Sequence, residues 1–225
     1  MDNEFWLAKW QRDEIGFHLN QVNPNLLEYW PALDMPAMPT VLVPLCGKSE
    51  DVLWLRQQGC SVIGIELSEI AIQALVEQCR ILLNIELYRT EDAGLISYQG
   101  DGIVLIQGDI FSVTADQIGP VDWVYDRAAV IAMPAGMRAD YAQQVMQLSQ
   151  YASQLLISLE YDQAVAGGPP FSVTQDDLED LYAATGRLTL TCLGRAERID
   201  EEPRFKSKGL TSLVEAGYQL SFARS

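Results

Sequence analysis

Histidine is nearly absent from this sequence, since His18 is the only one among 225 residues. A Ser-His-Asp hydrolase would have to use that single residue as its base. The four cysteines, Cys46, Cys60, Cys79 and Cys192, contain no C-x-x-C pair, so the ligands of a zinc site are missing and we expect no metal. Three of them lie in apolar surroundings, which favours buried free thiols over disulfides. These absences argue against hydrolase and metalloenzyme functions.

Basic charge and long apolar runs are also scarce. The chain has 15 lysines and arginines against 31 aspartates and glutamates, a formal net charge of −16. That charge repels nucleic acid and anionic lipid, so neither is an expected partner. No apolar run is long enough to span a bilayer, and no N-terminal apolar segment follows a basic region. We expect a cytoplasmic monomer in which residues 1–225 form one domain.

The segment 41–55, VLVPLCGKSEDVLWL, contains the Gly47-Lys48-Ser49 triplet of a phosphate-binding loop. A P-loop also needs a glycine five residues before the second one, because backbone N–H groups must wrap the phosphates. That position is Leu42, inside an apolar run typical of a buried strand, so this hypothesis fails. The pattern predicts instead a strand, a tight turn at Gly47 and a helix with Ser49 as its N-cap. Such loops lie at the carboxyl ends of parallel strands, where open α/β sheets bind ligands.

Strand and helix patterns alternate along the rest of the chain. They predict an α/β fold with a doubly wound, mostly parallel sheet of seven strands, helices on both faces and an antiparallel C-terminal hairpin. Residues 85–102 interrupt the alternation and predict a hairpin insertion. The seven strands are expected within residues 41–46, 61–67, 103–107, 121–126, 153–162, 187–199 and 211–223.

Acidic residues end three of the expected parallel strands: Glu66, Asp109 and Asp126. Glu66 lies 19 residues after Gly47, near the spacing at which a βαβ fold places an acid on a ribose diol. An adenosine bound across the sheet would also meet the other two. Each acid alone is equally typical of an N-cap or a turn, but three in register favour a nucleoside cofactor. A dinucleotide needs G-x-G-x-x-G, whereas this loop has one glycine, which favours S-adenosylmethionine over NAD.

Seven motifs run in order from about residue 5 to the last expected strand: FWLAKWQRDEIGFH, NPNLLEYWP, LVPLCGKSEDVLWLRQQGCSVIGIELSEIAI, GDIF, YDRAAVIAMP, YDQAVAGGPPFSV and EEPRFKSKGL. Together they resemble the thiopurine S-methyltransferase family in its compact bacterial form. The resemblance implies a class I methyltransferase-like Rossmann fold, S-adenosylmethionine as cofactor, and S-methylation of aromatic or heterocyclic thiols such as thiopurines. Selenium and tellurium compounds are further candidate acceptors. The aromatic-rich residues 1–30 are expected to form a helical lid.

The resemblance also implies roles for particular residues. At the cofactor it implies Trp10 as a cover, Leu45 at the methionine portion, Glu66 at the ribose, Ile110 beside the adenine and Arg127 near the transferred methyl. Phe17 would stack on the substrate, and Arg204 would close over the thiol. Arg127 and Arg204 are the expected catalytic residues, because two cations stabilise a thiolate. An acidic aromatic thiol needs no dedicated base, which agrees with the single histidine.

Simpler explanations stay open for several of these side chains. Trp6 and Trp10 lie one helical turn apart and could pack a helix onto the core. Arg127 could be a structural partner of Asp126. Arg204 could form an exposed salt bridge with the glutamates beside it, which contributes little to stability.

Three further questions stay open from the sequence. We expect His18 to be a structural hydrogen-bonding residue rather than a catalytic one. Phe205 and Lys208 depart from the family's pattern around EEPRF, so the substrate preference is undecided. The alternative functions are a nicotinamide-dependent oxidoreductase and a catalytically silent nucleoside-binding module on the same fold.

Overall fold

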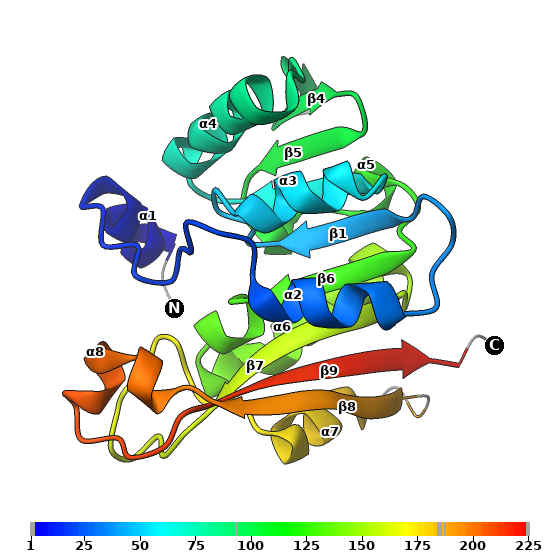
Figure 1. Cartoon of the computed structure of the whole chain (residues 1–225). Coiled ribbons are helices and arrows are strands. Elements are labelled where there is room, and N and C mark those ends of the chain that lie inside the picture. The colour runs from blue at the N-terminus through cyan, green and yellow to red at the C-terminus, as the bar shows by residue number, and fades with distance from the viewer. Residues whose placement is uncertain (1–2, 93, 184–185, 187, 224–225) are drawn as a thin grey trace.

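The computed structural model describes residues 3–92, 94–183, 186 and 188–223. Its strands form one sheet in the order β3-β4-β5-β2-β1-β6-β7-β9-β8, with helices on both faces (Figure 1). The strands are β1 (Thr40–Pro44), β2 (Ser61–Glu66), β3 (Tyr88–Asp92), β4 (Leu95–Gly100), β5 (Ile103–Gln107), β6 (Trp123–Arg127), β7 (Ser153–Glu160), β8 (Leu188–Glu197) and β9 (Val214–Phe222). Residues 1, 2, 93, 184, 185, 187, 224 and 225, some of which fall in the expected elements, lie outside the described residues.

The sheet is doubly wound about its first strand. From β1 the chain moves outward through β2 to β5, then returns to the other side of β1 with β6 and β7, and these five strands are parallel. β9 pairs antiparallel with both β7 and β8. The predicted fold class and C-terminal hairpin are confirmed. The strand order reverses between β1 and β6, and open α/β sheets bind ligands at that point.

Residues 85–102 contain the two strands β3 and β4, which pair antiparallel with each other. β4 also pairs antiparallel with β5, so the hairpin extends the sheet at this edge. The seven expected strands are present, and with the hairpin the described part of the chain has nine strands. Every residue of β3 is exposed, so this edge adds little to the core.

Helices cover the two faces unequally. α2, α3 and α4 pack one apolar layer, whereas α6 and α7 pack the other. Ser49 and Ser68 cap α3 and α4 as expected, each accepting a hydrogen bond from a backbone N–H of the first turn. The helices are α1 (Asn3–Gln11), α2 (Pro24–Tyr29), α3 (Glu50–Gln57), α4 (Glu69–Gln78), α5 (Ala115–Ile118), α6 (Ala135–Ser149), α7 (Gln175–Ala183) and α8 (Pro203–Lys206).

Both faces of the central strands are buried, which explains their near-continuous apolar sequence. In β1, Val41 and Val43 face the layer of α2, α3 and α4, while Leu42 between them faces the layer of α6. All four cysteines are free thiols, and three of them are buried, as expected. None of the helices within the described ranges is long and apolar enough to cross a membrane.

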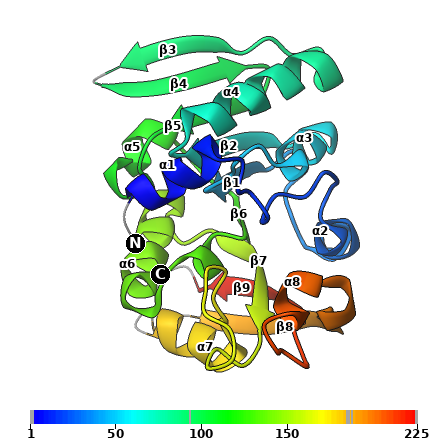
Figure 2. The same ribbon diagram turned by 90° about the vertical axis from the view of Figure 1, so that its left-hand side faces the viewer.

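The N-terminal helix stands apart from both layers. Figure 2 shows α1 in front of the carboxyl ends of β1, β2 and β5, with α8 and its loop on the other side of the same end of the sheet. The space between them lies over the switch point of the sheet. The fold therefore places two chain segments, one from each end of the sequence, over the expected ligand site.

Candidate active site

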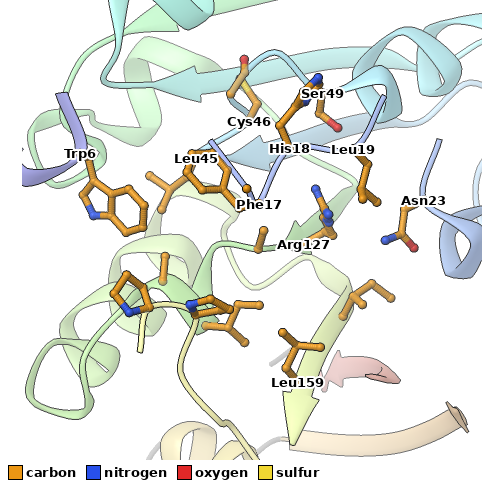
Figure 3. A pocket seen from close by; sticks show the side chains of 18 of the residues that line it. Trp6, Phe17, His18, Leu19, Asn23, Leu45, Cys46, Ser49, Arg127 and Leu159 are labelled. Atoms are coloured by element: carbon orange, nitrogen blue, oxygen red, sulfur yellow. The ribbon is translucent and has the colours of Figure 1, made fainter. Parts of the chain in front are cut away.

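A cavity of about 350 Å³ opens at the carboxyl ends of the parallel strands, between α1 and α8 (Figure 3). Its volume lies in the range of small-molecule sites. The loops after β1, β2, β5, β6 and β7 all contribute to its wall. It is lined by the seven residues to which the family resemblance gives a role: Trp10, Phe17, Leu45, Glu66, Ile110, Arg127 and Arg204.

Glu66, the last residue of β2, is a buried carboxylate, 7% exposed. Its Oε2 accepts a hydrogen bond from the backbone N–H of Gly47 at 3.0 Å, and its Oε1 accepts one from that of Ser68 at 2.7 Å. Burial raises the pKa of Glu66, against the effect of these hydrogen bonds. Because a carboxylate oxygen has two lone pairs, each can accept a second donor, such as a ribose hydroxyl.

The loop between β1 and α3 turns through two residues with left-handed backbone. Leu45 has φ +50° and Gly47 has φ +56°. A Cβ atom on Gly47 would lie 3.3 Å from Cζ2 of Trp10, so this glycine permits both the turn and the close approach of the indole. The loop lacks the glycines of a phosphate cradle, and the backbone N–H of its Gly47 donates to the carboxylate of Glu66 instead of to a phosphate.

Three aromatic rings form the cavity wall on the side of α1. Phe17 contacts both Trp6 and Trp10 edge-on, with centroids 5.7 and 5.8 Å apart. These rings pack against each other and over Gly47, outside the two apolar layers of the sheet. The tryptophans thus do more than attach a helix to the core. The Nδ2 of Asn3 also donates to Oδ2 of Asp109 at 2.9 Å, which ties α1 to the loop after β5.

Arg127 and Arg204 bring positive charge to the cavity from two different elements, the central strand β6 and the short helix α8. Arg127 ends β6, and its guanidinium forms no hydrogen bond or ion pair within the described part of the chain. Arg204 lies on α8, where its Nη1 would be 3.1 Å from a Cβ atom on Gly16. Glu201 pairs with Arg198 at 3.0 Å rather than with Arg204. Among the described residues no ion pair joins Arg127 to Asp126 or Arg204 to the glutamates beside it. Burial raises the pKa of Glu202, and the charge of Arg204 acts to lower it.

Asp126 does not reach the cavity, and the expectation that it meets an adenosine is wrong. Side chains alternate along β6, so Tyr125 and Arg127 lie on the cavity side and Asp126 points to the opposite layer. There its Oδ1 accepts from the backbone N–H of Val130 at 3.0 Å and its Oδ2 from the hydroxyl of Tyr141 at 2.7 Å. Asp109 does line the cavity, where it also caps the turn at residues 110–112.

A buried network at the cavity floor was not predicted from the sequence. Asp51 is 2% exposed, and its Oδ1 accepts from the backbone N–H of Asn23 at 2.7 Å. Its Oδ2 accepts from the hydroxyl of Tyr125 at 3.0 Å. The Asn-Pro pair that opens α2 marks Asn23 as an N-cap, but nothing in the sequence marks its contact with Asp51.

His18, expected only as a structural residue, also lines the cavity. Burial lowers the pKa of His18, and the charges of Lys48 and Arg127 lower it further. Asp51 and a hydrogen bond to Asn20 act in the opposite direction. The ordinary pKa of histidine, 6.5, is already below 7, so an imidazole with a lowered pKa is mainly neutral at pH 7.

The polar groups and apolar surfaces of the cavity fit S-adenosylmethionine. Glu66 can accept from a ribose, and Leu67 and Ile110 supply an apolar wall of the kind a purine ring needs. The loop after β1 offers a turn without a phosphate cradle, which suits a cofactor that has no phosphates. The residues that line the cavity could therefore hold S-adenosylmethionine.

Solved structures share this fold. An S-adenosylmethionine-dependent methyltransferase from Thiobacillus denitrificans, in complex with S-adenosylhomocysteine, has a TM-score of 0.61 at 17% identity, with 99% of each chain covered. At this level of identity the likeness shows the fold alone. The sequence relatives show the class of this protein, an S-adenosylmethionine-dependent methyltransferase.

Sequence comparison narrows the class to one family. The family profile described as "Thiopurine S-methyltransferase (TPMT)" matches residues 1–223. A "Thiopurine S-methyltransferase" of Bordetella petrii is 41% identical over 222 residues, 98% of both chains. One of Teredinibacter turnerae is 44% identical over 195 residues, 87% of this chain and 88% of that one. The chain belongs to the thiopurine S-methyltransferase family.

Asp126 gives a test of the structural role found for it. Burial raises the pKa of Asp126 from 3.8 to about 6, so the folded state binds this proton more tightly than the unfolded state does. The resulting stabilisation is complete below the unfolded pKa and is lost as the pH rises through the folded one. Asp126→Asn can still accept from Val130 through its Oδ1, and its Nδ2 can donate to the hydroxyl oxygen of Tyr141 in place of the present hydrogen bond. Relative to this variant, the wild-type free energy of unfolding should fall between about pH 4 and 7, by on the order of 3 kcal/mol.

Urea denaturation at a series of pH values measures this difference. The matched control is Asp140→Asn, an exposed position on α6, whose stability curve should run parallel to that of the wild type. Parallel curves for Asp126→Asn and the wild type would show that the buried carboxyl does not titrate in this range.

Proposed function

We propose that this protein transfers the methyl group of S-adenosylmethionine to the sulfur of small aromatic or heterocyclic thiols, thiopurines among them. The observation that carries the proposal is that one cavity holds a buried acid suited to a ribose, Glu66, and two arginines, Arg127 and Arg204, for which no ion pair is found among the described residues. Relatives named as thiopurine S-methyltransferases support the substrate class. Selenium and tellurium compounds, a cytoplasmic location and a monomeric state stay predictions.

The cofactor half of the cavity lies around the ends of β1, β2 and β5. S-adenosylmethionine, when bound there, supplies a methyl group on a positively charged sulfur. Glu66 would accept hydrogen bonds from the ribose, Ile110 would lie against the adenine, and Leu45 would contact the methionine portion. Trp10, held over Gly47, would cover the cofactor.

The substrate half lies toward β6 and α8. Arg127 and Arg204 would hold the thiol as its anion by Coulomb attraction, which is strong in a cavity that excludes water. Phe17 would stack on the aromatic ring. The chain's main task is alignment of the sulfur with the methyl carbon, which is a proximity effect. No proton has to be removed by the protein from a thiol that is already ionised, and His18, neutral at pH 7, is not needed as a base.

We further propose that residues 3–30 act as a lid that becomes ordered over the cofactor. α1 contacts the rest of the site through Asn3 and through the rings of Trp6, Trp10 and Phe17. These contacts lie over the cavity, so a bound cofactor would add to them. Hydrogen exchange in residues 3–30 should slow when S-adenosylhomocysteine binds, while exchange in α7 should not change. Equal protection with and without ligand would contradict the lid.

The alternative functions, an oxidoreductase and a silent nucleoside-binding module, predict different results in binding and transfer experiments. Calorimetric titration with S-adenosylhomocysteine, NADH as a control ligand, and a methyl-transfer assay on a panel of thiols separate them. Binding of S-adenosylhomocysteine with transfer to thiols supports the proposal. Binding without transfer to any thiol would indicate a silent nucleoside-binding module, and binding of NADH alone would indicate an oxidoreductase.

Glu66→Ala should weaken the binding of S-adenosylhomocysteine by about 1.5–3 kcal/mol, the range for hydrogen bonds to a charged group. The loss has two sources, because the carboxylate would bind the ribose and also fixes the N–H of Gly47. Calorimetry gives the dissociation constant. Glu69→Ala, an exposed position at the start of α4, is the control and should bind normally. An unchanged constant in folded Glu66→Ala would remove Glu66 from the site.

Arg204→Ala should lower kcat/KM for thiols by roughly ten- to a hundredfold, because a cation that stabilises the thiolate is lost. Arg204→Lys keeps the charge without the planar fork and should recover part of the rate. The affinity for S-adenosylhomocysteine should stay nearly constant in both, since α8 lies on the substrate side.

The control for Arg204 is Lys206→Ala on the same short helix. Lys206 pairs with Asp200 at 2.6 Å on the surface, and it does not line the cavity. Its removal should leave turnover unchanged, since exposed ion pairs contribute little. Full activity of Arg204→Ala on every thiol would refute the role of Arg204.

A further inference from the structure

The side chain of Asn23 is a buried amide at the edge of the cavity. It is 1% exposed and lines the cavity from the loop that precedes α2. Its Oδ1 accepts a hydrogen bond from the backbone N–H of Asn25 at 2.9 Å, as the N-cap of α2. Because the cap requires an oxygen, the orientation of the amide is fixed. Figure 3 shows it directed into the cavity on the side of Arg127.

The Nδ2 of this amide has no hydrogen-bond partner among the described residues. Most buried polar groups are paired, because a buried unpaired donor loses the hydrogen bonds it made to water. An unpaired donor that faces a binding cavity can recover this loss when a ligand supplies an acceptor. The unpaired Nδ2 of Asn23 is therefore typical of a donor that forms its hydrogen bond only with a bound ligand.

The position of Asn23 is held by the network below it. Its backbone N–H donates to Asp51, which also accepts from the hydroxyl of Tyr125. Tyr125 precedes Arg127 by two residues on β6, so the amide and the guanidinium are fixed to the same part of the sheet. Both groups are hydrogen-bond donors, and neither has an acceptor within the described chain. A ligand that satisfies both must present an acceptor to each of them.

We propose that Asn23 is a specificity-determining residue, whose Nδ2 donates a hydrogen bond to a ring nitrogen adjacent to the carbon that bears the sulfur of a heterocyclic thiolate. This inference rests on the proposed function. Ionised heterocyclic thiols of this type share their negative charge between the sulfur and the neighbouring ring nitrogen. Arg127 attracts the charge, and Asn23 recognises the nitrogen. A thiol with an all-carbon ring has no acceptor at that place.

Asn25 provides a matched comparison inside the same helix. Its Nδ2 is also unpaired and its side chain is 3% exposed, but it does not line the cavity. An ordered water could satisfy either amide without any role in recognition. The two positions differ in that Asn23 lines the cavity and Asn25 does not.

The test is the selectivity of Asn23→Ser, since serine keeps an N-cap oxygen and removes the amide nitrogen. Its kcat/KM for 2-mercaptopyrimidine should fall roughly three- to thirtyfold, while that for thiophenol should stay within about twofold of the wild type. The affinity for S-adenosylhomocysteine should not change. Asn25→Ser should leave the ratio of the two kcat/KM values as it is in the wild type.

Each other outcome overturns the inference. An equal fall of kcat/KM for both thiols would show that Asn23 has a structural role. No fall for either thiol would show that the Nδ2 binds an ordered water and not the substrate. If the wild type methylates neither thiol, the proposed function fails separately. The role of Asn23 is then decided by calorimetric binding of the two thiols to the complex with S-adenosylhomocysteine. Selective loss of 2-mercaptopyrimidine binding in Asn23→Ser supports the role, and unchanged or equal binding of both refutes it.

Discussion

The carboxylate of Glu66 connects the sheet to two loops of the cavity wall, and through one of them to α1. Buried at the end of β2, it holds the N–H of Gly47 in the loop after β1 and the N–H of Ser68 at the start of α4. Trp10 rests on that glycine, and α1 covers the site through Trp10 and its neighbouring rings. A buried charge is tolerated only when its hydrogen bonds are made, so the carboxylate fixes the spacing of these two loops.

Strained backbone and positive side chains are both found at the switch point. Leu45 after β1 and Ala128 after β6 are non-glycine residues with left-handed backbone, and both line the cavity. Such residues persist only when the surrounding structure determines them, which the buried sheet does here. The chain as a whole carries a charge of −16, so an anionic thiolate would be attracted by the local cations of the cavity, Arg127 and Arg204 among them.

The sequence predicts what depends on local chemistry and fails where distant parts of the chain meet. The N-caps, the turn at Gly47 and the acid at Glu66 follow from short patterns and spacing. Asp126 was misplaced, because the face that a strand residue takes depends on how β6 packs between its layers. The network of Asp51 was missed, because its partners lie 28 and 74 residues away. No pattern in one segment reveals such contacts.

The central claim is that the protein aligns a thiolate and supplies no base. The pH dependence of kcat/KM for methyl transfer to thiophenols of different acidity tests it directly, because this quantity reports the ionisation of free enzyme and free substrate. For 4-nitrothiophenol, thiophenol and 4-methoxythiophenol, the rise of kcat/KM with pH should have a midpoint that follows the pKa of each thiol. One common midpoint for all three would show that a group of the protein removes the proton, and would contradict the claim.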